Sequence, residues 1–68
     1  MDTLLTQRDA ALALSLSERT LERMRVQGFG PPFVRCGRSV RYRSSDLDQW
    51  IASRVVRSTS EELGRAVR

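Results

Sequence analysis

The sequence predicts a small, mostly α-helical domain that carries one β-hairpin, and three observations lead to this fold class. Two short segments with helical spacing of apolar residues follow one another across a very tight connection. The second segment runs into a glycine and proline stop, and two alternating segments around a Gly-Arg-Ser turn come next. Two helices joined by so short a turn form a helix-turn-helix, and a hairpin beside them makes the predicted fold a winged helix-turn-helix.

The first helix is predicted over Gln7–Leu14 from its N-terminal signal. Thr6 has the side chain of a helix N-cap, and Asp9 completes a T-x-x-D capping box. The two leucines before the cap, Leu4 and Leu5, form a short apolar segment that leads into the helix. Alanine and leucine recur at helical spacing after the cap, so one apolar stripe faces the core.

The second helix is predicted from Glu18 to about Gln27. Ser17 precedes it as N-cap, and Gly28 offers the left-handed conformation that ends many helices. Leu21 and Met24 are three residues apart and are expected to point inward together with Gly28.

The opposite face of this second helix carries positive charge. At about 100° per residue, Arg19 and Arg23 lie nearly opposite the core stripe, while Thr20 and Arg25 flank it. Arginines on a helix usually form a solvated face, but the second helix of a helix-turn-helix is the one that enters the major groove. Val26 shares the outer side, where it either contacts a thymine methyl or packs under the hairpin.

The hairpin is predicted from residues 33–35 and 40–43, with a turn over residues 36–39. Arg35, Arg38 and Arg41 would crowd this small ribbon without a countercharge. An ordinary solvated turn is the alternative, but the crowding of like charges favours a wing that contacts an anionic partner.

A third helix is predicted to begin after Ser44 or Ser45, with Asp48 closing an S-x-x-D capping box. The apolar residues that would form its inner face are Leu47, Trp50 and Ile51. We expect Trp50, the largest apolar side chain, to be a buried core anchor rather than a ligand contact. From Ser53 onward the pattern is lost.

Composition favours a nucleic-acid partner. The chain has 68 residues and a net charge of +4, and seven of its 12 basic residues lie between Arg19 and Arg43, where Glu22 is the only acid. A compact positive surface on one helix and one hairpin suits phosphates and base edges. A membrane surface is disfavoured because no basic amphipathic helix with a large aromatic face is present.

Catalysis and metal binding have few candidate residues. Histidine is absent, and the single cysteine, Cys36, excludes both an internal disulfide and a cysteine-based zinc site. We therefore predict no enzyme activity, no catalytic residue, no metal and no cofactor. The N-terminus does not resemble a signal peptide and no apolar stretch could span a bilayer, so a cytoplasmic location is expected.

Four motifs together resemble the small excisionase and AlpA-type regulators of prophages and integrative elements. The motifs are L-L-T-x-x-x-A-A, S-x-R-T-L-x-R, G-x-G-P-P-F-V-R-x-G-R-S-V-R-Y and D-L-x-x-W-I, and they span Leu4 to Ile51. The resemblance implies a winged helix-turn-helix related to the DNA-binding head of MerR regulators, in a bacterial, nucleoid-associated protein. The long dimerisation helix and effector domain of MerR regulators are not expected, which argues against small-molecule sensing.

The resemblance also implies which residues contact double-stranded DNA. The recognition positions are Ser17, Glu18, Arg19, Thr20 and Arg23, and the wing positions are Gly37, Arg38 and Ser39. The basic side chains that flank them, also expected at the interface, are Arg25, Arg35 and Arg41.

The function that this resemblance favours is that of a recombination directionality factor. Such an excisionase binds and bends attachment-site DNA so that the integrase of the same element excises it. An AlpA-like transcriptional regulator acting at promoters is the alternative. A protein-interaction module whose basic face docks an acidic partner is a third hypothesis.

The chain is expected to divide into a DNA-binding domain over residues 1–54 and a C-terminal tail over residues 55–68. The tail carries apolar side chains that have no place in the pattern of the domain. We expect them to link neighbouring copies on DNA. The alternative interpretation of the composition is a flexible C-terminus. The residues concerned are Val55, Val56, Leu63 and Val67.

Overall fold

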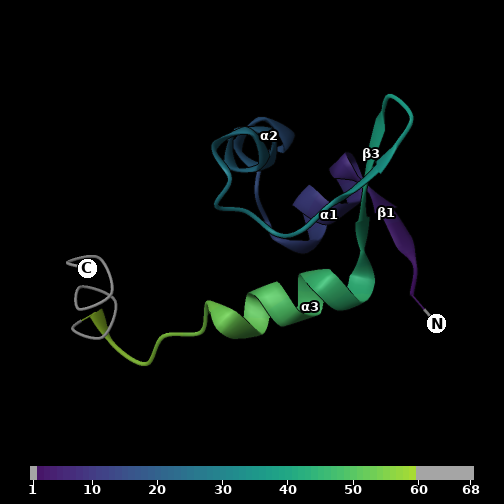
Figure 1. The fold of residues 1–68 in the computed structure, drawn as a ribbon. Helices are drawn as coiled ribbons and strands as arrows, with labels where there is room; N and C mark the ends of the chain where they lie inside the picture. Colours follow the sequence, from purple (N-terminus) through teal and green to yellow (C-terminus); the bar gives the residue numbers. More distant parts are fainter. Residues whose placement is uncertain (1, 60–68) are drawn as a thin grey trace.

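The computed structural model describes residues 2–59, which form three helices and a three-stranded antiparallel sheet (Figure 1). The elements follow in the order β1 (Leu4–Thr6), α1 (Gln7–Ala13), α2 (Glu18–Gln27), β2 (Val34–Cys36), β3 (Ser39–Arg43) and α3 (Ser44–Ser53). The predicted winged helix-turn-helix fold is thereby confirmed. Leu63 and Val67, two of the expected self-association residues, lie outside the described residues.

The two helices of the helix-turn-helix begin at the caps that the sequence predicts. Thr6 Oγ1 accepts a hydrogen bond of 3.1 Å from the Asp9 amide, and Ser17 Oγ accepts one of 3.1 Å from the Thr20 amide. Each bond satisfies an amide that the first helical turn leaves without a partner. Between the helices, Ser15 adopts a φ of 56°, which lets the chain reverse within a few residues.

The end of α2 depends on two glycines, of which only the first was assigned a role from the sequence. Gly28 has a φ of 83° and its amide donates to the carbonyl oxygens of Met24 and Arg25, as expected of a left-handed cap. It is exposed, however, so the expectation that it points inward was wrong. Gly30 instead approaches the core: a Cβ there would lie 3.0 Å from the Met24 Cβ.

The leucine segment at the N-terminus is a third strand, which the sequence analysis did not predict. β1 pairs antiparallel with β3, placing Leu5 opposite Tyr42, and β3 is therefore the central strand in the order β1-β3-β2. Three residues carry too little alternation to identify a strand. This strand forms because β3 provides the backbone hydrogen-bond partners for it, and the local sequence does not show that pairing.

The turn of the hairpin is shorter than the sequence predicted. Cys36 and Ser39 were assigned to the turn, but they pair with each other at the end of the β2-β3 ladder. The turn consists of Gly37 and Arg38 alone, and Gly37 adopts a φ of 62°. Two-residue hairpin turns require such positive φ values because their twist must match that of the strands. Phe33, expected in the first strand, precedes it.

The start of α3 differs from the prediction because a distant residue caps it. The N-cap position is Arg43, whose side chain makes no capping hydrogen bond, and the expected Ser45-Asp48 box is not formed. The Asp2 carboxylate accepts a hydrogen bond of 3.0 Å from the Ser45 amide instead. The side chain of Ser44 accepts one of 3.1 Å from the Thr3 amide, so the N-terminal segment is fastened to this helix.

The core lies where both helices of the helix-turn-helix meet the central strand and α3. The buried apolar residues are Ala10, Ala11, Leu21, Met24, Tyr42 and Leu47. Leu5, Leu14 and Val40 pack against this core from its edges. Because the cluster is thin, each large buried side chain contributes a substantial share of the stability, about 1.5–3 kcal/mol for a fully buried leucine.

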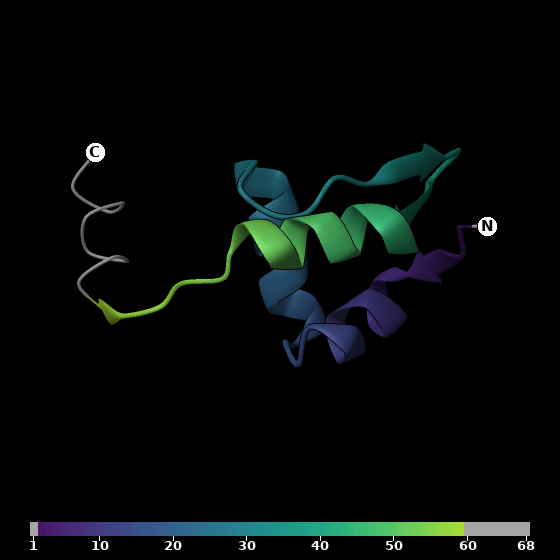
Figure 2. The ribbon, with the colours of Figure 1, turned by 90° about the horizontal axis from the view of Figure 1, so that it is seen from below.

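Trp50 is not the core anchor that its size suggested. It is half-buried and stands outside the core cluster, and Ile51, expected on the same inner face, is exposed. Only Leu47, in the first turns of α3, reaches the core; the helix then continues beyond it (Figure 2). The Trp50 ring is covered instead by the Arg54 guanidinium at 5.2 Å, which also donates to the Phe29 carbonyl at 3.1 Å.

Candidate nucleic-acid interface

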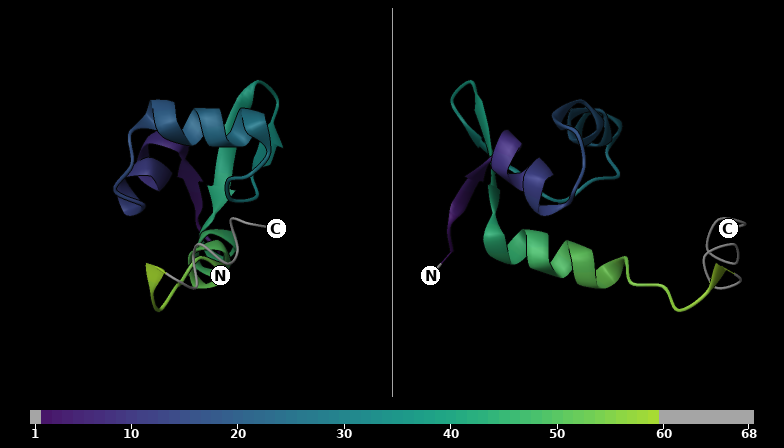
Figure 3. Two further views of the ribbon diagram at one scale, coloured as in Figure 1. Left: turned by 90° about the vertical axis from the view of Figure 1, so that its left-hand side faces the viewer. Right: turned by 180° about the vertical axis from the view of Figure 1, so that it is seen from behind.

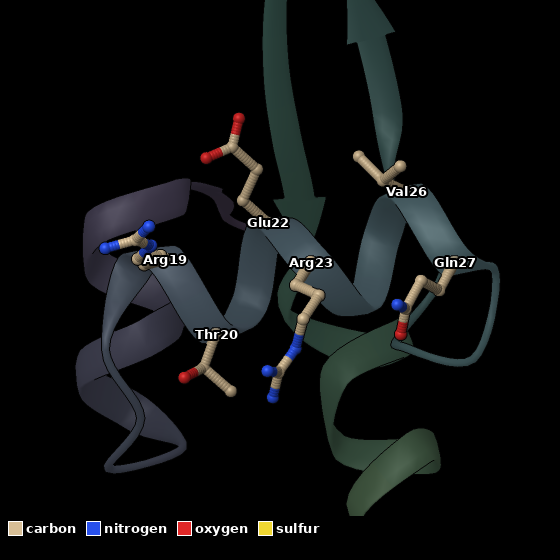
Figure 4. Close-up of a pocket in the computed structure, with 6 residues that line it drawn as sticks. All are labelled: Arg19, Thr20, Glu22, Arg23, Val26 and Gln27. Carbon is tan, nitrogen blue, oxygen red and sulfur yellow. The ribbon is translucent and has the colours of Figure 1, made fainter.

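The outer face of α2 is the best-defined candidate site. Six side chains of this one helix surround a shallow depression of about 420 Å³ (Figure 4): Arg19, Thr20, Glu22, Arg23, Val26 and Gln27. Because all of them come from one helix, the depression is part of a convex surface rather than an enclosed cavity for a small molecule. A helix of this length spans about 15 Å, and with its side chains it is about 10–12 Å wide, which matches the ~12 Å width of a B-DNA major groove.

The side chains of this face divide into two flanks. Figure 4 shows Glu22 and Val26 pointing toward the side on which the hairpin rises, and Thr20 and Arg23 pointing the other way, toward α3. A helix seated in a groove presents both flanks to DNA, so neither direction excludes a contact. Arg19 and Arg23 are both exposed, as the helical spacing predicted.

The N-terminal end of α2 holds the remaining predicted recognition residues. Ser17 Oγ, besides capping the helix, donates a hydrogen bond of 2.9 Å to the Thr20 hydroxyl oxygen. Thr20 therefore accepts from the cap while its own hydroxyl hydrogen stays available to another acceptor. Glu18 is exposed in the first turn, where the helix dipole favours a carboxylate.

Arg25 has a different environment from the other arginines of α2. Its side chain is only 16% exposed, and its guanidinium lies 5.7 Å from the centre of the Phe33 ring and 3.9 Å from Glu22 Oε1. Burial raises the pKa of the neighbouring Tyr42, and the positive charge of Arg25 opposes that rise. Neither Tyr42 Oη nor Arg25 Nε has a hydrogen-bond partner in the described part of the chain. Arg25 thus joins α2 to the base of the hairpin.

The hairpin carries its arginines in three directions. Opposite residues of an antiparallel pair share a face, so Arg35 lies on the face of Val40, while Arg41 lies on the face of Val34. Arg35 stacks 5.8 Å from the centre of the Phe33 ring, and Arg41 donates to the Val40 carbonyl at 2.9 Å. Arg38 stands at the exposed tip beside Gly37.

The helix face and the hairpin tip lie on one side of the molecule. Figures 1 and 3 show α2 and the tip on the side opposite α3. The structure therefore brings α2 and the hairpin tip to the same side, with Arg25 packed between the two elements. On α2, Glu22 and Val26 point toward the hairpin side, whereas Thr20 and Arg23 point toward α3. Val55 and Val56, the described members of the expected self-association set, are exposed beyond the end of α3.

Three residues that line the site were not among the predicted recognition positions, although Val26 was considered as a possible thymine contact. Glu22, Val26 and Gln27 line the same depression as the two arginines. Their signal was present: Gln27 is four residues after Arg23, and Val26 is four after Glu22, so each pair shares a side of the helix. The predicted recognition positions lay within residues 17–23, before Val26 and Gln27, and they did not include the acidic Glu22.

Metal-ligand clusters and membrane-spanning helices are both absent from residues 2–59. This part of the chain contains no group of three metal-ligating side chains. None of the helices described is long and apolar enough to cross a membrane.

Comparison with known families identifies the domain. The family model described as a helix-turn-helix domain matches residues 4–55, which include every helix and strand described above. The chain belongs to this family. The small AlpA-type and excisionase-like helix-turn-helix proteins are members of it, and membership supports sequence-specific binding to double-stranded DNA. Such DNA-binding domains are not normally enzymes. A comparison with the curated proteins gives no match.

Proposed function

We propose that this helix-turn-helix protein is an excisionase, a recombination directionality factor that binds and bends attachment-site DNA. The observation that carries the proposal is the pairing of an exposed arginine-bearing α2 face with an arginine-tipped hairpin on one side of the domain. In this proposal α2 enters the major groove, and the hairpin contacts the adjacent minor groove or backbone. The family match supports DNA binding, and the motif resemblance to small excisionases favours a role in recombination.

The arginines of α2 and of the hairpin have different roles in the proposed complex with DNA. Arg19 and Arg23 contact base edges, because a guanidinium pairs with guanine through two parallel hydrogen bonds. Arg35, Arg38 and Arg41 neutralise phosphates, which fixes the register without selecting a sequence. Arg25 acts through Phe33 by holding the hairpin at a fixed angle to α2.

Bending explains why such a protein would act in several copies. Smooth bending of a short site costs on the order of 1–6 kcal/mol, and a single small module buries only about 600–1,000 Å² on DNA. Several bound copies share the elastic cost and hold the bend that the integrase of the element requires.

Three measurements on the attachment DNA of the element that encodes the chain test the proposal. Footprinting should show protection of discrete sites beside the core of that DNA, and a circular-permutation gel assay should show a bend. Adding the protein to a reaction with the integrase of the same element should then stimulate excision. Protection without a bend or excision would overturn the excisionase assignment.

The same domain would serve an AlpA-like transcriptional regulator, because the motifs are common to both groups. Protection of a promoter, together with a change in its activity and no effect on excision, would identify that role. A module that docks an acidic protein would instead show weak binding to duplex DNA with little dependence on salt, whereas phosphate contacts make DNA affinity fall steeply as salt rises.

A further inference from the structure

We infer that Val26 is a specificity-determining residue that contacts the 5-methyl group of a thymine in the major groove. The inference deepens the proposed function and rests on it, since it assigns one base to the recognition surface of α2. Val26 packs under no part of the hairpin: it is 72% exposed and stands outside the core cluster.

A single exposed apolar residue does not by itself indicate a binding site. The position of Val26 on the helix distinguishes it from such residues. At about 100° per residue, Val26 lies closer than Arg23 to the direction diametrically opposite Leu21 and Met24. It is surrounded by polar and charged side chains, Arg19, Glu22, Arg23 and Gln27 among them. A valine at the centre of such a face has no partner within the described domain.

The hairpin indicates that this end of α2 faces DNA. Arg25, the residue before Val26, contacts Phe33 at the base of the hairpin, so the wing and the C-terminal half of α2 are held together. Figure 4 shows Val26 pointing toward the side on which the hairpin rises. In the proposed binding mode, a duplex that touches α2 on the hairpin side lies over Val26.

The chemistry of the major groove offers one apolar partner. Thymine alone among the four bases presents a methyl group there, and apolar side chains contact it. Valine suits this contact because its branched side chain is restricted to few rotamers and loses little freedom when it is fixed. Arg19 and Val26 are seven residues apart, about 10 Å along a helix, so the two side chains would contact different base pairs.

Deoxyuridine substitution tests the contact at the level of a single methyl group. The specific site is first obtained by selection from random duplexes. Each thymine in it is then replaced by deoxyuridine, which removes only the methyl. We expect one position to weaken binding of the wild-type protein roughly fourfold, the loss that corresponds to one buried methylene-sized group. Val26→Ala should show no loss at that position while it keeps any losses at others.

The control is Leu12→Ala, which shortens an apolar side chain that is 68% exposed on α1 and to which no DNA contact is assigned. It should retain the full wild-type response to deoxyuridine. Alanine is a strong helix former, so Val26→Ala is expected to fold. A variant with the wild-type response at every thymine, or a selected site in which no thymine methyl matters, would overturn the inference and leave DNA reading by α2 intact. If selection returns no preferred sequence, sequence-specific binding fails and the inference fails with it.

Discussion

Arg23 is the residue whose substitution separates base recognition from phosphate binding. It is exposed on α2 beside Arg19, and a bidentate contact with guanine discriminates against other bases by about 1–3 kcal/mol. We predict that Arg23→Ala weakens binding to the specific site much more than binding to random duplex, measured by fluorescence anisotropy at fixed salt. Equal losses on both DNAs, with the helical circular dichroism signal preserved, would make Arg23 a phosphate contact.

Arg8→Ala is the matched control for this prediction. Arg8 is an exposed arginine on α1, so its removal lowers the net charge by the same amount without touching the outer face of α2. Any loss that it causes is expected to be similar on specific and random duplex. The difference between the two variants then measures base recognition, free of the general effect of charge.

The hairpin is the element that should add affinity with little sequence preference. Arg38 stands at its tip, where Gly37 allows the two-residue turn. Arg38→Ala is predicted to lower affinity on all duplexes and to reduce the slope of log affinity against log salt by about 1. Arg38→Lys keeps the charge and should restore most of the slope. Unchanged affinity and slope in the alanine variant would mean that the tip points into solvent when DNA is bound.

The stability that the N-terminal segment gives to α3 is expected to depend on pH because Asp2 is a titratable group. Hydrogen bonds from Ser45 lower the pKa of this carboxyl below its ordinary value of 3.8 in the folded chain. A lowered folded pKa means that the stabilisation is fully present above the unfolded pKa and is lost as pH falls through the folded one. Asp2→Asn should therefore lower the melting temperature at pH 7, and the gap to wild type should narrow as the pH falls below 3.8 and through the lower folded pKa.

Asp48→Asn controls for the loss of a carboxylate on α3 itself. Asp48 is exposed and was the capping partner that the sequence suggested, yet the observed cap comes from Asp2. We expect its substitution to leave the melting temperature close to that of wild type. A larger effect from Asp48 than from Asp2 would show that the local capping box, rather than the distant carboxylate, holds this helix end.

The elements that could be predicted are those specified by their own residues. Thr6, Ser17 and Gly28 act within three or four positions, so α1 and α2 were placed within a residue of their observed bounds. β1 and the cap of α3 were missed because their partners lie about forty residues away, as the pairing of Leu4 with Arg43 shows. No local pattern contains that information.

Within the candidate site, the same distinction separates the exposed arginines from Arg25. Helical spacing was sufficient to predict that Arg19 and Arg23 are exposed. The packing of Arg25 on Phe33, and its approach to Tyr42, depend on how the hairpin folds back on α2. Trp50 was misplaced for a related reason: its size predicts burial, but Leu47 is the residue of α3 that reaches the core, and Trp50 is half-buried outside it.

At the scale of the whole molecule, the proposed DNA-binding side and α3 lie on opposite sides of the domain. Val55 is 64% exposed beyond α3, and neighbouring Val56 is also exposed. We propose that residues 55–68 form a tail that is separate from the DNA-binding domain, and the helix-turn-helix family match, which ends at residue 55, is compatible with that boundary. Apolar groups on this side would remain accessible to another copy when DNA is bound.

The last prediction concerns cooperative filling of neighbouring sites. One small module on DNA buries too little surface for tight and selective binding, so contacts between adjacent copies would raise their effective concentration and turn weak sites into a filled array. Removing residues 57–68 leaves the family-matched segment intact. We expect the truncated chain to bind a single site with unchanged affinity and to fill tandem sites without cooperativity, measured by titration of duplexes with one and with two sites.

The 68-residue chain with Val55 and Val56 replaced by serine distinguishes specific contacts from loss of residues 57–68. Both side chains are exposed, so the substitutions should not disturb the fold. If the valines form part of the contact, this variant should lose part of the cooperativity while its single-site affinity stays at the wild-type value. A truncated chain that fills tandem sites as sharply as the intact protein would show that the tail does not link neighbouring copies. Adjacent molecules would then have to interact through the winged domain itself or through the bend that each imposes on the DNA.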